Sequence, residues 1–224
     1  MRIRTIDNFT SKVADQLAWR RKELTELKAL VEGSGDNHVR QSMLIRAGVA
    51  LLYAHWEGFV KGTGAYLLEF VSEQRLTHAE LQPNFISVIL RKRLNIAKQS
   101  KKVSTTGEMV DFFCTKMQSR ANIPSKDVID TNSNLSSSVL SEILWTLGLD
   151  EKPYVTKKLI LDERLVKKRN SIAHGQSLNI SLEDYLSLHT EVLALIDEFR
   201  NQLENACVEK KYMRKSPLTA FMPS

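Results

Sequence analysis

Apolar residues recur at spacings of three and four along most of this chain of 224 residues, which is the pattern of amphipathic helices. Helix breakers are scarce, with nine glycines and five prolines. No convincing series of strands and no internal repeat accompanies the pattern. The sequence therefore predicts an all-α fold, a helical bundle of about six to seven helices.

Capping residues and breakers set the limits of the predicted helices. The helix from 38 to 74 is apolar on more than one face near its middle, so we expect it at the centre of the core. Residues 120–134 are polar and irregular, which indicates a loop. We expect one domain over 1–210, followed by a flexible basic tail over 211–224. The predicted helices cover residues 6–32, 38–74, 84–98, 106–119, a helix through 147 that begins at capping residues 134–138, 153 to the IAHG run at 172–175, and 181–210.

The charge of the chain favours an anionic partner. Lys and Arg exceed Asp and Glu by 32 − 26 = 6 residues, an excess that suits nucleic acid. Cys114 and Cys207 form no zinc-ligand pattern, and we expect no metal and no cofactor. The longest apolar stretch, 47–53, is too short to span a bilayer, and no signal peptide is recognisable. We therefore expect a cytoplasmic protein that does not bind membranes.

The run KKRNSIAHG at 167–175 carries the candidate chemistry, in Arg169, Asn170 and His174. A guanidinium suits a phosphate that develops charge, and an imidazole transfers protons near neutral pH. RNA supplies its own nucleophile, the 2′-hydroxyl, so a proton-transferring His174 and a cationic Arg169 are sufficient for cleavage. The motif predicts RNA cleavage without a metal ion.

The spacing of Arg169 and His174 is awkward for a single helix. At about 100° per residue, five steps separate the two side chains by about 140°. Either the helix ends before His174, assisted by Gly175, or a second copy of the chain completes the site. An Arg-x4-His pattern also arises by chance. Arg169 would then be a surface ion-pair partner, and His174 an ordinary residue at a helix C-terminus.

Three segments together resemble the HEPN superfamily, in which an Arg, usually followed by a polar residue, precedes a His by four to six positions. KKRNSIAHG resembles that signature. Residues 46–71, with YAHWEGF at 53–59, and residues 130–150, with SNLS at 133–136, are similar to its MAE-type and RiboL-PSP-type branch. The three segments follow one another in the family's order, and the resemblance covers residues from about 40 to 200.

The resemblance implies a HEPN-like helical bundle that forms a homodimer through the Arg169–His174 region and acts as a metal-independent endoribonuclease. Such proteins commonly serve as toxins or antiviral effectors in prokaryotic defence or toxin–antitoxin systems. An antitoxin or regulatory protein is therefore an expected partner besides RNA. The position two residues after His174 is Gln176, which argues against the HEPN toxins that are silenced by modification of a tyrosine there.

Other residues have candidate supporting roles. Glu57 lies in an apolar helix and would orient Arg169 or a histidine, or else pair structurally in the core. His55 is a weaker candidate for such a role, and Tyr53 and Trp56 are expected in the core or at a dimer interface. Lys167 and Lys168 adjoin Arg169 and would bind RNA. Two further basic clusters, Arg91 to Arg93 and Lys98, Lys101 and Lys102, are open to RNA guidance or to simple solvation. The tail cluster Lys210, Lys211, Arg214 and Lys215 is open to binding of nucleic acid or of an acidic partner.

Two other functions compete with the endoribonuclease. The first is a catalytically inactive helical module that serves as a regulatory subunit of a defence complex, because some HEPN members have lost activity. The second is a basic protein that binds nucleic acid without chemistry, for which steeply salt-dependent binding would be the mark.

Overall fold

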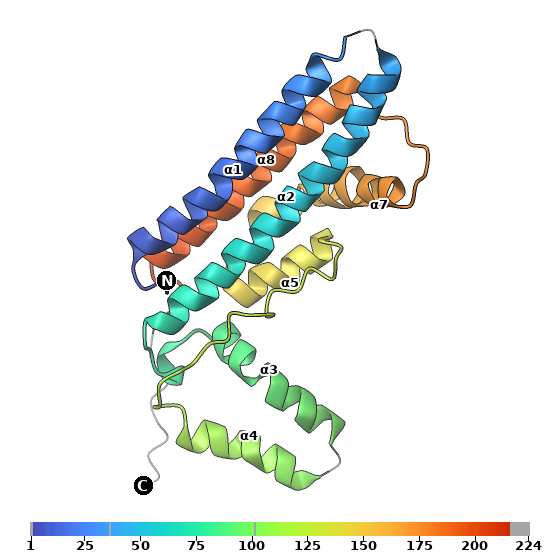
Figure 1. The fold of residues 1–224 in the computed structure, drawn as a ribbon. Coiled ribbons are helices and arrows are strands. Elements are labelled where there is room, and N and C mark those ends of the chain that lie inside the picture. Colours follow the sequence, from blue (N-terminus) through green and yellow to red (C-terminus); the bar gives the residue numbers. More distant parts are fainter. Residues whose placement is uncertain (1, 36, 101, 216–224) are drawn as a thin grey trace.

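The computed structural model describes residues 2–35, 37–100 and 102–215. Three long helices lie side by side and form the body of the molecule (Figure 1): α1 (Ile6–Glu32), α2 (His38–Glu73) and α8 (Leu182–Val208). The helical bundle that the apolar periodicity predicts is confirmed. The remaining elements are η1 (His78–Glu80), α3 (Pro83–Gln99), α4 (Val103–Thr115), α5 (Ser137–Leu147), α6 (Lys152–Val155), the π-helical η2 (Ile160–Lys167) and α7 (Lys168–Ala173).

The core of the bundle lies between α2 and α8, as the two-sided apolar pattern of α2 predicts. Trp56 and Phe59 of α2 are fully buried and pack against Phe199 of α8, with ring centroids 6.1 Å and 6.4 Å apart. Both pairs are edge-to-face, an arrangement that adds about 0.5–1.5 kcal/mol per pair beyond burial. α2 is therefore the structural centre from which the functional segment is positioned.

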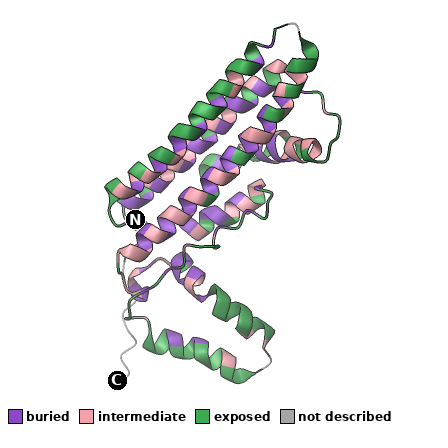
Figure 2. Ribbon diagram, in the orientation of Figure 1, coloured by how far each residue is buried: buried purple, intermediate pink, exposed green. Residues whose placement is uncertain are grey.

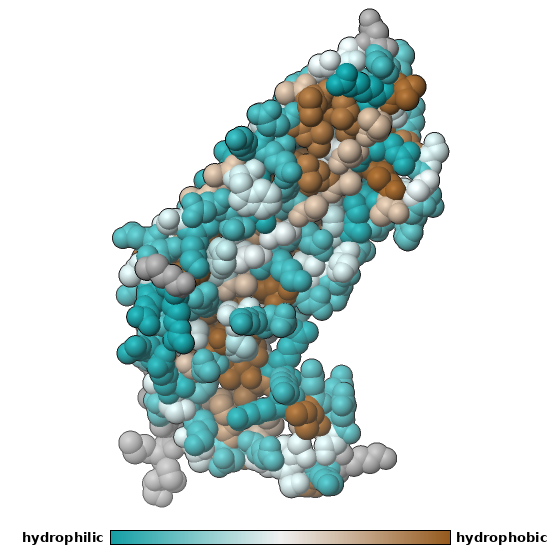
Figure 3. Space-filling view, viewed as in Figure 1, coloured by the Kyte–Doolittle hydropathy of each residue, from teal (hydrophilic) through white to brown (hydrophobic). Residues whose placement is uncertain are grey.

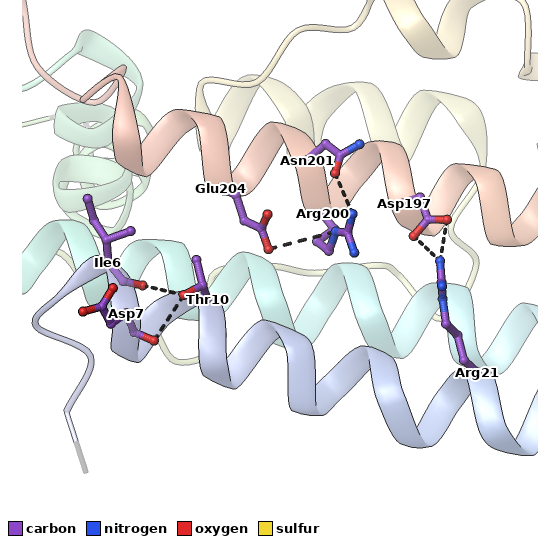
Figure 4. Close-up of polar contacts among 8 residues, drawn as sticks. All are labelled: Ile6, Asp7, Thr10, Arg21, Asp197, Arg200, Asn201 and Glu204. Atoms are coloured by element: carbon purple, nitrogen blue, oxygen red, sulfur yellow. Dashed lines mark hydrogen bonds and ion pairs between the residues drawn. The ribbon is translucent and has the colours of Figure 1, made fainter.

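Polar contacts mark the outer seam between α1 and α8 (Figure 4). Nη2 of Arg21 lies 2.5 Å and 2.6 Å from the two carboxylate oxygens of Asp197. The other contacts drawn lie within one helix: Arg200 donates to the side chain of Asn201 in α8, and Thr10 donates to the carbonyls of Ile6 and Asp7 in α1. Such exposed ion pairs contribute only about 0–1 kcal/mol each, so the buried apolar side chains hold these helices together.

A second group of helices crosses α2 and leads to the KKRNSIAHG run. Asp162 of η2 accepts hydrogen bonds from the amide and the hydroxyl of Ser137, at 2.7 Å and 2.6 Å. The carboxylate thereby ties η2 to the first turn of α5, where unpaired amides attract anions. Ser136, within the predicted capping residues 134–138, is the N-cap of that helix.

The predicted helix from Pro153 to the IAHG run is wrong as one continuous α-helix. α6 ends at Val155, and the chain turns before the helix resumes as the π-helix η2. Hydrogen bonds from i to i+5 bring residues five apart closer to one face than an α-helix does. Leu161 and Val166 are both buried at that spacing, so the π turn lets both reach the core.

The fourth predicted helix, 106–119, is displaced, because α4 runs from Val103 to Thr115. The chain leaves the helix early to pair with the segment after α2. The amide of Ala121 donates to the carbonyl of Leu76 at 2.8 Å, and the amide of His78 donates to that of Ser119 at 3.2 Å. Backbone pairing with a distant segment is not encoded in local periodicity, which explains the error.

The packed domain also extends beyond the predicted boundary at 210. Tyr212 is buried, with its ring centroid 5.9 Å from that of Phe70. Arg214 donates from Nε to the carbonyl of Leu81 at 2.9 Å. The start of the predicted flexible tail is thus docked on the body, and residues 216–224 of that tail lie outside the described part of the chain.

Candidate functional site

The KKRNSIAHG run ends a helix at His174, as the position of Gly175 predicts. His174 is the C-cap of α7, with φ −85° and ψ 10°. Gly175 then adopts a left-handed conformation, with φ +71°. The amide of Gln176 donates to the carbonyl of Ser171 at 2.9 Å, which completes the helix-ending turn. The motif histidine therefore stands at an exposed helix end.

Arg169 is held by two partners from other segments. Its guanidinium lies 3.8 Å from the ring centroid of Tyr53 in α2, a cation–π contact. Nη2 donates to the carbonyl of Ser133 at 2.7 Å. Nε is buried and has no hydrogen-bond partner among the described residues. The guanidinium is thus fixed in orientation while it keeps a donor without a protein partner.

Tyr53 links α2 to the loop before α5. Its hydroxyl oxygen accepts a hydrogen bond from the buried amide of Leu135 at 2.8 Å. Burial raises the pKa of Tyr53; the Leu135 amide and the charge of Arg169 oppose that rise, and the charge of Glu57 adds to it. The phenol therefore stays protonated at neutral pH and serves as a platform for Arg169.

A surface pocket of about 310 Å³ opens beside Arg169. The pocket contains one cationic side chain, Arg169, and one anionic side chain, Glu57. Glu57 lies one turn after Tyr53 on α2, so both residues face the pocket. Oε1 of Glu57 is buried with no hydrogen-bond partner in the part of the chain that the structure describes. The volume of the pocket is at the lower limit for ligand sites, about 300 Å³. The pocket is lined by Ala50, Tyr53, Ala54, Glu57, Ser133, Arg169, Ile172 and Ala173.

The structure brings together only some of the predicted site residues. Asn170 donates to the side chain of Asn134 at 3.4 Å, so Arg169 and Asn170 both contact the SNLS segment. Glu57 shares the pocket with Arg169, although no hydrogen bond joins the two in the described chain. His174 is exposed and does not line the pocket. Of the predicted site residues, Arg169 and Glu57 line the pocket, and His174 does not.

The two lysines before the motif differ in their surroundings. Nζ of Lys167 lies 2.7 Å from the carboxylate of Glu163, one turn earlier. Lys168 is partly exposed and has no ion pair among the described residues. Of the two predicted RNA contacts, Lys168 is the one whose charge is not already paired within the chain.

His55 has a structural environment. It is buried, and its Nε2 lies 2.8 Å from the carboxylate of Glu23 in α1. The ring of Trp19 packs edge-on against it, with centroids 5.0 Å apart. Burial lowers the pKa of His55, although Glu23 opposes that shift. This histidine connects α1 to α2 and lies outside the pocket of Arg169.

Sequence reasoning missed two residues of the pocket, Tyr53 and Ser133. Tyr53 precedes Glu57 by four positions, so a helical α2 already places both on one face. Ser133 has φ +53° and Asn132 has φ +51°, a left-handed pair that turns the Ser133 carbonyl to Arg169. The polar residues before α5 predict a turn, but they do not predict that the turn contacts Arg169.

An all-helical bundle with an Arg–polar–x3–His motif at the end of a short helix defines a domain of the HEPN class. The RiboL-PSP-HEPN family model matches residues 15–205, and the chain belongs to this family. Membership indicates a nuclease-like or RNA-related function. No curated protein and no solved structure matches the chain.

Two further properties concern the described residues only. None of their helices combines the length and apolar character needed to cross a membrane. They also contain no group of three or more His, Cys, Asp or Glu side chains arranged to hold a metal ion.

Proposed function

We propose that the protein is a metal-independent endoribonuclease that acts as a toxin or antiviral effector in a prokaryotic defence or toxin–antitoxin system. The observation that carries the proposal is the fixed guanidinium of Arg169 at a surface pocket, five residues before an exposed His174 at a helix end. Family membership adds a class of protein in which RNA-related activity is expected.

The proposed reaction is an attack of the ribose 2′-oxygen on the adjacent phosphorus. The imidazole of His174 takes the 2′-hydroxyl proton, the P–O5′ bond breaks, and the leaving 5′-oxygen receives a proton from an imidazolium. Arg169 stabilises the charge that develops on the phosphoryl oxygens. The products are a 2′,3′-cyclic phosphate and a 5′-hydroxyl. The 2′-hydroxyl of the substrate is the nucleophile, so no activated water is required.

A homodimer through the Arg169–His174 region would complete the site. His174 lies outside the pocket of its own chain, so a second copy related by a two-fold axis would supply an imidazole to it. Mixing Arg169→Ala with His174→Ala protein tests this arrangement. A shared site regains activity in the mixed dimer, where one arginine faces one histidine, whereas a site within one chain stays inactive.

Cleavage of RNA in excess chelator tests the function itself. Wild-type protein is expected to cut, and Arg169→Ala and His174→Ala are each expected to lose about 10²–10⁴-fold in rate. His38→Ala and Arg40→Ala are matched controls, because both side chains are exposed at the start of α2. Equal cleavage by all five proteins, or cleavage that requires metal, would reject the proposal.

The second candidate is a catalytically inactive helical module that serves as a regulatory subunit of a defence complex and does not depend on His174. The exposed position of His174 outside the pocket of Arg169 favours it. In this case the antitoxin or regulatory partner would bind equally well to His174→Ala and wild-type protein. Full biological function of His174→Ala in the native system would favour this candidate over the endoribonuclease.

A further inference from the structure

The net charge of the chain resides in one short segment. Residues 81–107 contain six Lys or Arg and no Asp or Glu, so they carry +6, which equals the net charge of the whole chain. The remaining residues are balanced. Five of the six cations lie in the described chain: Arg91, Lys92, Arg93, Lys98 and Lys102. All five are exposed, and none forms an ion pair with another described residue.

These cations stand on a helical hairpin that projects from the body (Figure 1). We call residues 91–116 the arm. Every α3 residue from 91 to 96 is exposed, and most of α4 is exposed as well (Figure 2). Phe112 of α4 is buried and lies 5.8 Å from the guanidinium of Arg93. Neighbouring like charges repel, and the arm has only two carboxylates, Glu108 and Asp111, beside its cations, so an anionic partner would relieve this repulsion.

Two surface pockets border the arm, and each is lined by one of its arginines together with residues from outside α3. A pocket of about 340 Å³ is bordered by Arg93, Lys116 and Arg120, and no carboxylate lines it. A second, of about 210 Å³, lies between Arg91 and the loop residues Asp130 and Asn132. The neighbouring residue in that loop, Ser133, holds Arg169. The carboxylates of Asp130 and Glu142 line this second pocket, so the arm adjoins the loop of the candidate site without a continuous positive surface between them.

We propose that the arm is a docking surface for single-stranded RNA, which it binds by the phosphate backbone and leads towards Arg169. The choice of RNA rests on the proposed endoribonuclease, while the basic character of the surface does not. α3 has 17 residues, and a helix rises about 1.5 Å per residue, so it is long enough to contact several successive phosphates. Each neutralised phosphate of a single strand contributes about 0.7 to the slope of log K against log salt.

An anionic membrane is the alternative partner, and the test includes it. Val103, Val110 and Phe113 of α4 are exposed apolar residues on the same arm, which a lipid surface would also accept. Apolar residues occur elsewhere on the surface too (Figure 3), so they do not single out the arm. RNA is favoured because the exposed cations of α3 lie next to the loop that holds Arg169, so a strand bound to the arm would pass close to the proposed site.

The experiment measures binding of a fluorescent single-stranded RNA to His174→Ala protein in chelator, so that cleavage does not interfere. The arm variant adds Arg91→Gln, Lys92→Gln, Arg93→Gln and Lys98→Gln. The control variant removes the same charge elsewhere, at exposed and unpaired positions of the described chain: Lys22→Gln, Arg40→Gln, Lys61→Gln and Lys152→Gln. Thermal unfolding of both variants checks that the fold is kept.

At physiological salt the arm variant is expected to bind RNA about tenfold or more weakly than the parent protein. Its slope of log K against log salt should be smaller in magnitude by about 2–3. The control variant should lose about twofold or less in affinity. Equal weakening in both variants would overturn the proposal, and so would binding of the parent protein to phosphatidylserine vesicles but not to RNA. Crosslinking of 4-thiouridine RNA is a second readout, and labelling that avoids residues 91–102 would also contradict it.

The proposal that the arm binds RNA and the proposal that the protein cleaves RNA can be rejected independently. Loss of binding in the arm variant, together with a wild-type protein that does not cleave, supports the arm and rejects the endoribonuclease. Cleavage by wild type with unchanged binding in the arm variant rejects the arm and keeps the endoribonuclease.

Discussion

The bundle of α1, α2 and α8 and the motif helix α7 are built in opposite ways. The bundle buries aromatic side chains completely, Trp56 and Phe199 among them, whereas α7 contains no buried residue. α7 is positioned by a few polar contacts of Arg169 and Asn170. Changes in the bundle should therefore cost stability, and changes in α7 should cost activity with little loss of stability.

Tyr53 is the residue where the two regions meet. It belongs to the buried face of α2, yet its ring carries Arg169 and its hydroxyl holds the loop at Leu135. A substitution of Tyr53 tests whether these contacts with the bundle are needed to hold Arg169 in place.

The largest expected effect tests the bundle. Trp56→Ala should lower the free energy of unfolding by about 3–5 kcal/mol, because it opens a cavity among fully buried side chains. Urea unfolding measures the change. Trp145→Ala is the control, since the indole of Trp145 is 55% exposed on α5. If both substitutions cost the same, burial of Trp56 does not stabilise the bundle as described.

A smaller effect is expected from overpacking the bundle at Gly48. A Cβ there would lie 2.5 Å from the buried ring of Tyr185 in α8. Gly48→Ala should lower the free energy of unfolding by about 1–3 kcal/mol because the helices must move apart. The same substitution at Gly62 meets no atom within 4 Å. Gly62→Ala should stabilise the helix by up to about 1 kcal/mol, and an opposite order of the two variants would contradict the packing of α2 on α8.

Tyr53→Phe should affect both regions at once. The substitution leaves the buried amide of Leu135 without its acceptor, which costs about 1 kcal/mol or slightly more. RNA cleavage should also fall, since the loop that holds Arg169 loses its anchor. Tyr154→Phe is the control, because the buried hydroxyl of Tyr154 has no hydrogen-bond partner in the described chain. A Tyr53→Phe protein that is less stable yet fully active would show that the hydroxyl of Tyr53 is not needed to position Arg169.

The smallest effect concerns acid stability of the seam between α1 and α2. Burial lowers the pKa of His55 in the folded protein, so the unfolded chain takes up the proton first as the pH falls. The contribution of His55 to stability is therefore present above its ordinary pKa of about 6.5 and is lost below it. The Tm should fall from pH 7.5 to pH 5, and His55→Gln should flatten this fall. His38→Gln, at an exposed site, should leave the profile unchanged.

Much of the fold was predictable because the long helices have strong apolar periodicity. α1 and α2 begin and end within about one residue of their predicted limits, with Thr5 and Asn37 as their N-caps. α5 has its N-cap, Ser136, among the predicted capping residues 134–138 and ends at the predicted Leu147. The π-helix η2 and the docking of Tyr212 were not predictable, because both depend on burial against distant segments. Likewise, a motif identifies Arg169 but cannot show that Tyr53 and Ser133 hold it.

In the proposed reaction, Arg169 and His174 cleave RNA by attack of its own 2′-hydroxyl. The most direct measurement is the chemistry of the product ends after digestion in excess chelator, by mass spectrometry. We predict 2′,3′-cyclic phosphate and 5′-hydroxyl ends from wild-type protein, and no such products from His174→Ala. Products with 3′-hydroxyl and 5′-phosphate ends, or identical products from His174→Ala, would contradict the claim.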